Sequence, residues 1–336
     1  MKKIFIAVCC FLLGFSLVSS SQVKKVDAIG IIVSDMDRSE KFYSEVLQFK
    51  KISDQELQGE NWEKLFGVFG IRFRVVRMAL GEEVIDLVDY LTAGGRSIPE
   101  DARSNDLFFQ HIAIVVSDMD SAYKILRRFG VQHVSTGPQT LPASIPAAAG
   151  IKAFYFHDPD HHNLEIIYFP KGKGQDKWQK PGGKIFLGID HTAIGVSSTD
   201  KSHQFYQHLL GIERKGDSWN KGIEQEHLNN VEGASLHITG YRSAAGPGIE
   251  FLEYIKPGPG KKYPADTRSD DLWSWHTSLH VENAEKLFQQ LKSPRSPYRV
   301  VSKELVVIKR DGKPVQKSFL ARDPDGHALL FVETLD

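Results

Sequence analysis

The stretch HTAIGVSSTDKSHQFYQHLLGI (residues 191–212) decides the fold, because the chain carries an earlier version of it, AIGIIVSDMDRSEKFYSEVLQF (residues 28–49). The two align without gaps at an offset of 163 residues (191 minus 28), and Phe42-Tyr43 then matches Phe205-Tyr206. A second pair, HIAIVVSDMD from His111 and HTSLHVENAE from His276, aligns at an offset of 165 (276 minus 111). Self-similarity held over such distances indicates that the chain is a duplication.

Each half is itself doubled, since AIGIIVSDMD and HIAIVVSDMD share the run VSDM. Every copy begins with an alternating, β-branched run, which predicts a strand. A Ser or Asp then precedes an amphipathic stretch, which is typical of a capped helix. Further apolar runs separated by Gly, Pro and Asn predict about three more strands. The sequence therefore predicts an α+β fold made of four βαβββ modules.

One such module leaves an apolar sheet face exposed, so the modules are expected to pair. The polar, Gly- and Pro-rich stretch KGKGQDKWQKPGG (residues 171–183) is interpreted as the linker between two domains, residues 22–170 and 184–336. A surface loop within one domain is the alternative interpretation of this stretch. A length of 336 residues agrees with two domains.

The N-terminal residues have a different character. Lys2 and Lys3 precede an apolar run, residues 4–18, which ends in three serines. This pattern predicts a signal peptide, residues 1–21, that is cleaved on export to the periplasm or the exterior. Because the apolar run is shorter than a membrane-spanning helix needs, no stable membrane span is expected after cleavage.

Charge and cysteine content narrow the partners and the chemistry. Lys+Arg and Asp+Glu balance at 42 each, which argues against a nucleic-acid partner. Both cysteines, Cys9 and Cys10, lie inside the predicted signal peptide, so the mature chain is expected to contain neither disulfides nor thiolate ligands. Any metal would then be held by imidazole and carboxylate groups, the ligands that suit Fe, Zn, Mn or Ni.

Two motifs are more specific: FYQHLLGI (residues 205–212) and DPDHHNLEIIYF (residues 158–169). With their repeats they resemble the vicinal oxygen chelate superfamily, which comprises glyoxalases, bleomycin-resistance proteins and extradiol dioxygenases. The resemblance covers nearly the whole chain after residue 21. It implies two glyoxalase-like domains, each with a cup-shaped mixed sheet around one divalent metal. Each module of that family offers one ligand from its first strand and one from its last.

Carried over position by position, the resemblance implies eight candidate positions. The first-strand positions are Ala28, His111, His191 and His276, and the last-strand positions are Asp86, Glu165, Glu250 and Leu330. Ala28 and Leu330 cannot bind a metal. Each domain pairs its own two modules, so the C-terminal cup offers His191, Glu250 and His276, and the N-terminal cup offers Asp86, His111 and Glu165 as a second, weaker set. Neither cup then keeps the four ligands that a glyoxalase requires.

The C-terminal set is the preferred metal site, because two imidazoles and one carboxylate form the triad used for non-haem iron. Glu250 is the candidate catalytic residue that would move a proton. The implied activity is that of a metal-dependent lyase, isomerase or ring-cleaving dioxygenase acting on a small molecule with vicinal oxygens. The alternatives are a non-catalytic small-molecule binding protein with degenerate metal sites and a purely structural member. A homo-oligomer is compatible with the sequence.

Overall fold

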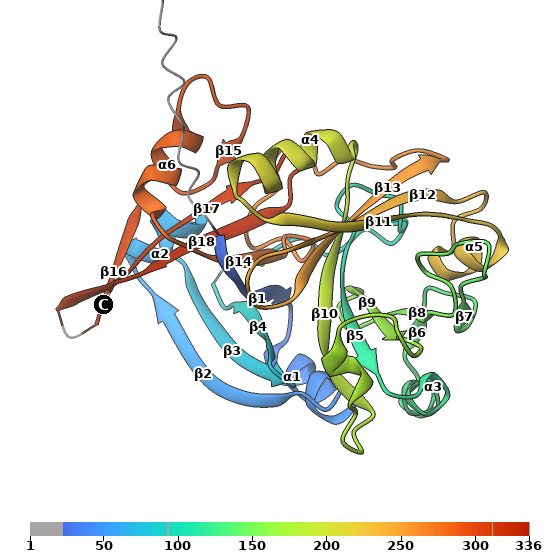
Figure 1. The fold of residues 1–336 in the computed structure, drawn as a ribbon. Coiled ribbons are helices and arrows are strands. Elements are labelled where there is room, and N and C mark those ends of the chain that lie inside the picture. Colours follow the sequence, from blue (N-terminus) through green and yellow to red (C-terminus); the bar gives the residue numbers. More distant parts are fainter. Residues whose placement is uncertain (1–22, 93, 311, 336) are drawn as a thin grey trace, which may run out of the picture.

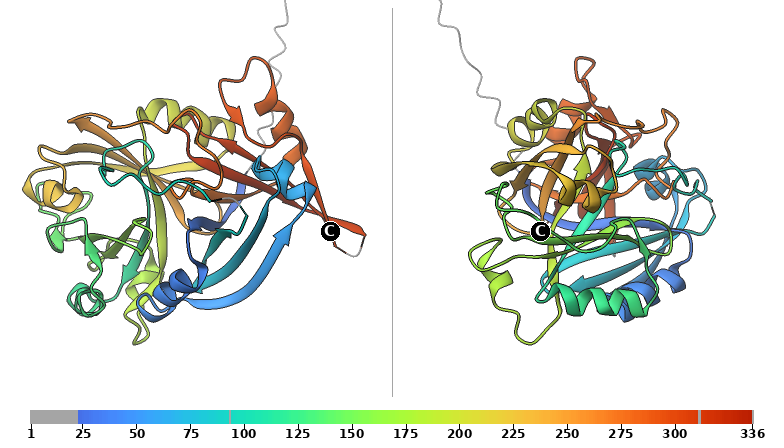
Figure 2. Two further views of the ribbon diagram at one scale, coloured as in Figure 1. Left: turned by 180° about the vertical axis from the view of Figure 1, so that it is seen from behind. Right: turned by 90° about the vertical axis from the view of Figure 1, so that its right-hand side faces the viewer.

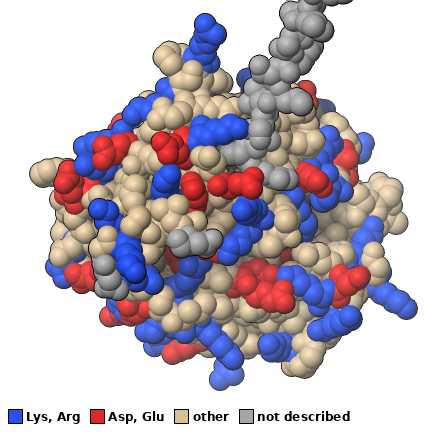
Figure 3. Space-filling model, turned by 60° about the vertical axis from the view of Figure 1, so that its left-hand side comes forward, with Lys and Arg blue, Asp and Glu red and all other residues tan. Residues whose placement is uncertain are grey.

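The computed structural model describes residues 23–92, 94–310 and 312–335. The predicted signal peptide, residues 1–21, lies outside the described residues. Within the described part of the chain, none of the helices is both long enough and apolar enough to cross a membrane. On the face drawn in Figure 3, basic and acidic side chains are interspersed, in agreement with the balanced composition.

Each module follows the predicted order of a strand, a helix and further strands. The first module consists of β1 (Val23–Val33), α1 (Met36–Glu45), β2 (Lys50–Gln58), α2 (Glu60–Phe66), β3 (Arg72–Leu80) and β4 (Glu83–Tyr90). The second consists of β5 (Gln110–Val116), α3 (Met119–Arg128), β6 (Gln132–His133), β7 (Gln139–Thr140), β8 (Lys152–His157) and β9 (Asn163–Tyr168).

The second half repeats this plan after the short 3-10 helix η1 (Asp176–Gln179). The third module consists of β10 (Phe186–Gly195), α4 (Thr199–His203), the π-helical turn η2 (Gln204–Leu209), β11 (Glu213–Lys221), α5 (Ile223–Asn229), β12 (Ser235–Arg242) and β13 (Gly248–Lys256). The fourth consists of β14 (His276–Val281), α6 (Ala284–Lys292), β15 (Arg299–Val300), β16 (Val306–Arg310), β17 (Lys313–Arg322) and β18 (Ala328–Thr334).

The helix starts confirm the predicted Ser or Asp caps in three modules, and an Asn takes this place in the fourth. The first helix of each module is preceded by a short polar residue whose side-chain oxygen accepts from a backbone N–H in the first turn. These N-caps are Asp35, Asp118, Ser198 and Asn283.

The strands form two nine-stranded sheets, and each sheet combines modules from both halves of the sequence. Sheet A has the order β15-β17-β18-β14-β1-β4-β3-β2, with β16 beside β17, and joins the first module to the fourth. Sheet B has the order β11-β12-β13-β10-β5-β9-β8-β6, with β7 beside β8, and joins the second module to the third. In Figure 1 the blue and red modules accordingly lie together, as do the green and yellow ones. Figure 2 shows the same grouping from two other directions.

This pairing differs from the expected pairing of sequence neighbours. The segment 171–183 connects β9 to β10 within sheet B, so it is a loop inside one paired unit and does not separate the two cups. Its Trp178 is buried and packs against that sheet. The chain crosses between the sheets elsewhere, through residues 91–109 and 257–275. The first strands of all four modules resemble one another, so the repeat alone does not specify which two pair antiparallel at the middle of a sheet.

Each half of the sequence is nevertheless held together by its Asp-Pro-Asp turn. Tyr43 of α1 donates to Asp158 Oδ2 at 3.1 Å, which ties the first module to the second. Tyr206 donates to Asp323 Oδ2 at the same distance, which ties the third module to the fourth. Both links cross from one sheet to the other, and one large apolar core contains residues of both sheets. The two sheets therefore form a single packed body.

Candidate metal centre

Sheet B brings four candidate ligands to one face. His111, Glu165, His191 and Glu250 lie on β5, β9, β10 and β13, which are four adjacent strands. The register places Ala113 of β5 beside both His191 and Glu165, and Ala193 of β10 beside both His111 and Glu250. Directly paired and alternate residues share a face. We call this face of sheet B cup B, and the corresponding face of sheet A, which carries Ala28, Asp86, His276 and Leu330, cup A.

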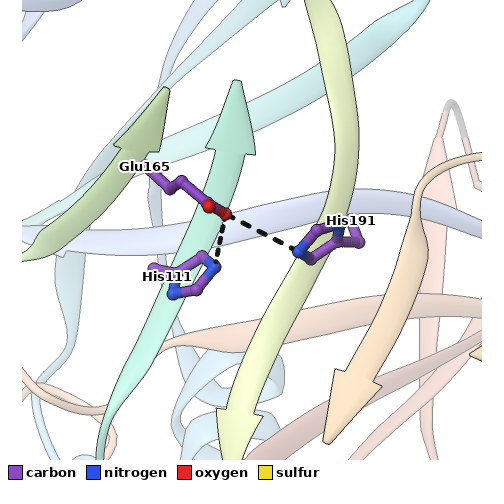
Figure 4. A group of neighbouring side chains, drawn as sticks. All are labelled: His111, Glu165 and His191. Carbon is purple, nitrogen blue, oxygen red and sulfur yellow. Dashed lines mark ion pairs between the residues drawn. The ribbon is translucent and has the colours of Figure 1, made fainter. Parts of the chain in front are cut away.

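Three side chains of cup B, those of His111, Glu165 and His191, point toward one another (Figure 4). Glu165 Oε2 lies 3.1 Å from His111 Nε2 and 3.8 Å from His191 Nε2. Ligand atoms of these three residues all lie within 4.8 Å of one another, so the group could hold a metal ion. Glu250 Oε1 lies 3.4 Å from His191 Nε2 and makes a fourth member.

Neither predicted set is brought together as a set. His276 of the preferred set lies on β14 in sheet A, while its other two members, His191 and Glu250, lie in cup B. Asp86 of the second set lies on β4 in sheet A, while His111 and Glu165 lie in cup B. The cause is the crossed pairing of modules, because a ligand set forms from modules that share a sheet. Each of these positions lies on a cup face as expected, but the predicted grouping of the positions into two sets is wrong.

The donor atoms of cup B suit a metal better than they suit one another. The Nε2 atoms of His111 and His191 are buried and face carboxylate oxygens at 3.1 and 3.4 Å without making a well-oriented hydrogen bond within the described part of the chain. Buried polar atoms are rarely left unpaired, and a bound ion is one established way to satisfy them. Bare imidazole nitrogens beside carboxylate oxygens are a donor set for divalent transition metals. The residues therefore fit a divalent metal.

Asp190 fixes the orientation of His191. Its Oδ2 lies 3.0 Å from His191 Nδ1, which leaves Nε2 directed at the centre. Trp178 Nε1 and Arg242 also donate to Asp190, at 2.7 and 2.6 Å. Burial works to raise the pKa of Asp190, but these donors and the histidine hold it far below its ordinary value. A carboxylate behind a histidine in this way sets the tautomer and position of a metal-ligating imidazole.

His191 and Glu250 polarise each other. Burial alone would lower the pKa of His191, but the charge of Glu250 and the hydrogen bond to Asp190 raise it well above its ordinary value. Burial alone would raise the pKa of Glu250, but the charge of His191 brings it below its ordinary value. The centre thus attracts positive charge, as a cation site must.

The surroundings of the centre are mostly apolar, with one open side. Phe109 and Tyr155 pack against the His111 ring, with ring centroids 5.5 and 4.8 Å away. Glu250 is the most accessible of the four, with 26% of its side chain exposed. Its cross-strand neighbour is Gly240, where a β-carbon would meet nothing within 4 Å. The centre is therefore most exposed beside Glu250.

Among the described residues, cup A holds no comparable group. His276 is buried beside Phe66 and over Gly30, where a β-carbon would collide with its imidazole. Burial lowers the pKa of His276 to about 4. Asp86 faces Arg77, whose Nε lies 3.6 Å from its Oδ1, and burial raises the pKa of Asp86 to about 6.

Sequence reasoning missed the four-residue set and its supports, Asp190 and Tyr155. A signal was present for the set, because the two positions that cannot bind a metal, Ala28 and Leu330, belong to the first and fourth modules. If the first module pairs with the fourth, the second pairs with the third, and all four ligand positions of those two modules then share one cup. The sequence contains no comparable signal for Asp190 or Tyr155, whose roles follow from the fold.

Comparisons with known proteins agree with this architecture. The sequence model of the Glyoxalase/Bleomycin resistance protein/Dioxygenase superfamily matches residues 25–166 and 188–331. Glyoxalase I from Zea mays is similar in structure, with a TM-score of 0.60 and 14% identity over 94% of this chain and 92% of that chain. A putative dioxygenase from Bacillus subtilis subsp. subtilis str. 168 has a TM-score of 0.55 and 17% identity over 94% of this chain and 87% of that chain. No curated protein matches the chain significantly. Because the matched ranges cover most of the sequence, the chain belongs to the Glyoxalase/Bleomycin resistance protein/Dioxygenase superfamily.

Proposed function

We propose that the chain is a divalent-metal-dependent lyase or isomerase that acts in cup B on a small molecule with vicinal oxygens. The convergence of His111, Glu165, His191 and Glu250 is the observation that carries this proposal. With Glu250 as the fourth member, these residues would provide in one cup the four-ligand set that glyoxalase chemistry requires. The superfamily as a whole binds small-molecule substrates, and the similar structure from Zea mays is described as glyoxalase I.

A bound divalent metal would act as a Lewis acid on the two neighbouring substrate oxygens. The protein residues supply the rest. His111 and Glu165 come from the second module and His191 from the third, so the site needs both modules in register. The packing of Tyr155 and Phe109 against His111 excludes water from the inner side of the centre.

Glu250 is the residue placed to move the proton. It stands at the accessible edge of the centre, beside the open position at Gly240. In a lyase or isomerase a carboxylate at this place takes a proton from the carbon next to the substrate carbonyl and returns it to the neighbouring atom. Its oxygen is 3.4 Å from His191, so a substrate held at the centre lies within reach.

A ring-cleaving dioxygenase is the second candidate. Without Glu250, the buried group consists of two imidazoles and one carboxylate, which is the ligand set of non-haem iron oxygenases. The similar structure from Bacillus subtilis is described as a putative dioxygenase. In this candidate Glu250 is a free base beside the iron site.

Metal content is the first test. Wild-type protein purified without chelator is expected to carry about one divalent metal per chain. His111→Ala and His191→Ala are each expected to lose it. The matched control is His276→Ala, which removes the first-strand histidine of cup A and is expected to keep the metal. Metal that persists in both cup B variants would contradict the proposed centre.

Proton exchange separates the candidates. The metal-loaded wild type is expected to exchange the carbon-bound protons of hydroxyacetone with deuterated water, followed by NMR. Glu250→Gln is expected to slow this exchange about a hundredfold, in the range of lost general-base catalysis, while its folding is unchanged. Oxygen uptake with catechols, and no exchange, would favour the dioxygenase. Bound metal with neither activity would favour a binding protein.

A further inference from the structure

The segment 171–183 borders the candidate centre. Its Trp178 is buried in an apolar cluster that also contains Ala113. Ala113 pairs directly with His191 on one side and with Glu165 on the other, and directly paired residues share a face of a sheet. Trp178 therefore packs on the face of sheet B that carries the candidate ligands, although the sequence predicts its segment to be a linker between domains.

The segment is held in place from two sides. Gly188 of β10 lies against the Trp178 ring, and a β-carbon at Gly188 would come within 2.8 Å of that ring. Lys177, the neighbour of Trp178, pairs with Glu83 Oε1 at the start of β4. Glu83 is buried, and its Oε2 accepts from the backbone N–H of Ile189 at 3.1 Å. The first module thus contacts both the segment and strand β10.

Asp190 is the residue through which the segment reaches the centre. It is the extra residue of a β-bulge in β10, between Ile189 and His191. Its Oδ1 accepts from Trp178 Nε1 at 2.7 Å and from Gln175 Nε2 at 3.1 Å. Its Oδ2 lies 3.0 Å from His191 Nδ1. One buried carboxylate therefore connects two side chains of the segment to a candidate ligand.

This connection decides which nitrogen of His191 is free to bind a metal. An ionised carboxylate only accepts hydrogen bonds, so His191 Nδ1 carries a proton and Nε2 is left for the centre. The two donors of the segment hold Asp190 Oδ1, and the carboxylate then keeps its Oδ2 on the imidazole. Loss of such an outer partner lowers metal affinity by about 10- to 100-fold in metalloproteins.

The repeat shows which part of this arrangement is specific to the third module. Asp27 is the counterpart of Asp190 (190 minus 163), and it too is the extra residue of a bulge, before Ala28. Arg77 donates to Asp27 Oδ2 and Arg242 to Asp190 Oδ2, each at 2.6 Å. The bulge, the carboxylate and the arginine thus belong to the module itself. Among the described residues, the segment donates to Asp190 and not to Asp27, whose neighbour is no ligand.

We propose that the segment 171–183 positions His191 for metal binding, with Trp178 and Gln175 as positioning residues that act through Asp190. The proposal rests on the proposed function, in that His191 is a ligand of the centre. It goes beyond that function because it makes a segment outside the four modules part of the metal site.

The Zn²⁺ affinity of the full chain, measured by competition with a chromophoric chelator, tests the proposal. Trp178→Phe keeps a ring and removes the Nε1 donor, and Gln175→Leu removes the other donor. Each is expected to weaken Zn²⁺ binding about tenfold, and Asp190→Asn about a hundredfold. Two matched controls are expected to keep the wild-type affinity. They are Trp219→Phe, at an exposed tryptophan of β11, and Asp27→Asn, at the counterpart of Asp190.

Proton NMR separates positioning from a mere loss of stability. The Nδ1 proton of His191 is enclosed between the ring and Asp190, so it is expected to exchange slowly with water and to give a signal downfield of the amide protons. His191→Gln identifies this signal by removing it. Trp178→Phe and Gln175→Leu are each expected to speed its exchange with water about tenfold, in metal-free and metal-loaded protein alike, while circular dichroism stays unchanged.

The outcomes distinguish this proposal from the proposed function. If the wild type binds Zn²⁺ and both folded segment variants bind it equally well, the proposal is overturned and the function stands. The same holds if affinity falls while exchange of the His191 proton is unchanged. If the wild type binds no metal, the function fails, and faster exchange in the variants still supports the positioning of His191. Gln175→Leu, a change at a partly exposed position, keeps the test decisive if Trp178→Phe unfolds.

Discussion

Cup A and cup B are built from the same repeated module, yet they carry different side chains at the four ligand positions. Cup B gathers His111, Glu165 and His191 in one group, with Glu250 beside His191. The corresponding positions of cup A hold His276 and Asp86 together with Ala28 and Leu330. The neighbouring positions differ as well. The short helix before the third strand of the module ends in Asn229 in cup B and in Phe66 in cup A.

The two cups also differ in the side chains beside the Glu250 position and in those that line a cavity in sheet B. Gly240 beside Glu250 corresponds to Arg77 beside Asp86, by cross-strand pairing. His157 and Asn163, which line a cavity of about 780 Å³ in sheet B, correspond to Arg322 and Ala328. Arg322 is buried and donates to Gly326 O at 2.7 Å, and Phe66 belongs to an apolar cluster that fills cup A. The comparison teaches that cup A replaces three polar or small positions of cup B, Asn229, His157 and Gly240, with the larger side chains Phe66, Arg322 and Arg77.

The largest effect is expected from a substitution at Gly240, the open position beside Glu250. Gly240→Arg introduces into cup B the side chain that cup A has at Arg77. The new guanidinium is expected to pair with Glu250 and to place a positive charge beside His191. Metal affinity should fall about a thousandfold, or about 4 kcal/mol. Titration of the metal-free protein with Zn²⁺, followed by calorimetry, measures the change.

The reciprocal variant, Arg77→Gly, is the matched control. It removes the guanidinium from cup A and is expected to leave Zn²⁺ affinity unchanged, because cup A does not contribute to the centre. Equal losses in both variants would mean that the two cups are not independent. Unchanged affinity in Gly240→Arg would remove Glu250 from the site.

The repeat made most of the fold predictable, and the pairing of modules was the missing step. The strand, helix and three-strand order follows from local patterns such as the Asp35 cap and the alternation in residues 111–116. Pairing depends on long-range contacts, such as β1 with β14, that local patterns do not encode. The predicted metal site is wrong for the same reason, because its members His276 and His191 lie in two different sheets. Single positions were predictable since they depend on the module alone.

His276 sharpens the comparison through its response to pH. Burial lowers its folded-state pKa to about 4, from an ordinary value near 6.5, so the unfolded chain binds the proton more tightly. Its neutral form stabilises the fold above pH 6.5, and this contribution is lost as the pH falls toward 4. His276→Leu should remove that loss. From pH 8 to pH 4 the unfolding free energy of the variant should rise by about 2–3 kcal/mol relative to wild type.

Urea unfolding at a series of pH values measures this difference. Asp86 has a raised pKa and acts in the opposite direction, because the folded state holds its proton more tightly between about pH 6 and 4. Subtracting the wild-type curve from the variant curve cancels that contribution. Parallel curves for the two proteins would show that His276 is not held neutral by burial.

The two Asp-Pro-Asp turns are alike in the two halves of the chain, whereas the two cups differ. Asp158 accepts from the backbone N–H of Asp160 and of His162, and Asp323 accepts from those of Asp325 and His327. Both turns serve the same structural purpose, since each joins a module to the preceding one across the two sheets. Their energetic contributions should therefore be equal, unlike those of the cups.

Tyr43→Phe and Tyr206→Phe test this equality with the smallest expected effect. Each removes one buried hydrogen bond to an aspartate that keeps its other donors, so each should cost about 1 kcal/mol of unfolding free energy. Because the two sites share no partner, the double variant should lose the sum of the two single losses. The midpoints of urea unfolding, compared at an unchanged dependence of the free energy on urea concentration, measure the loss in all three variants. A loss confined to one tyrosine would show that the halves have diverged at the turns as well as in the cups, because the same bond would then stabilise only one of them.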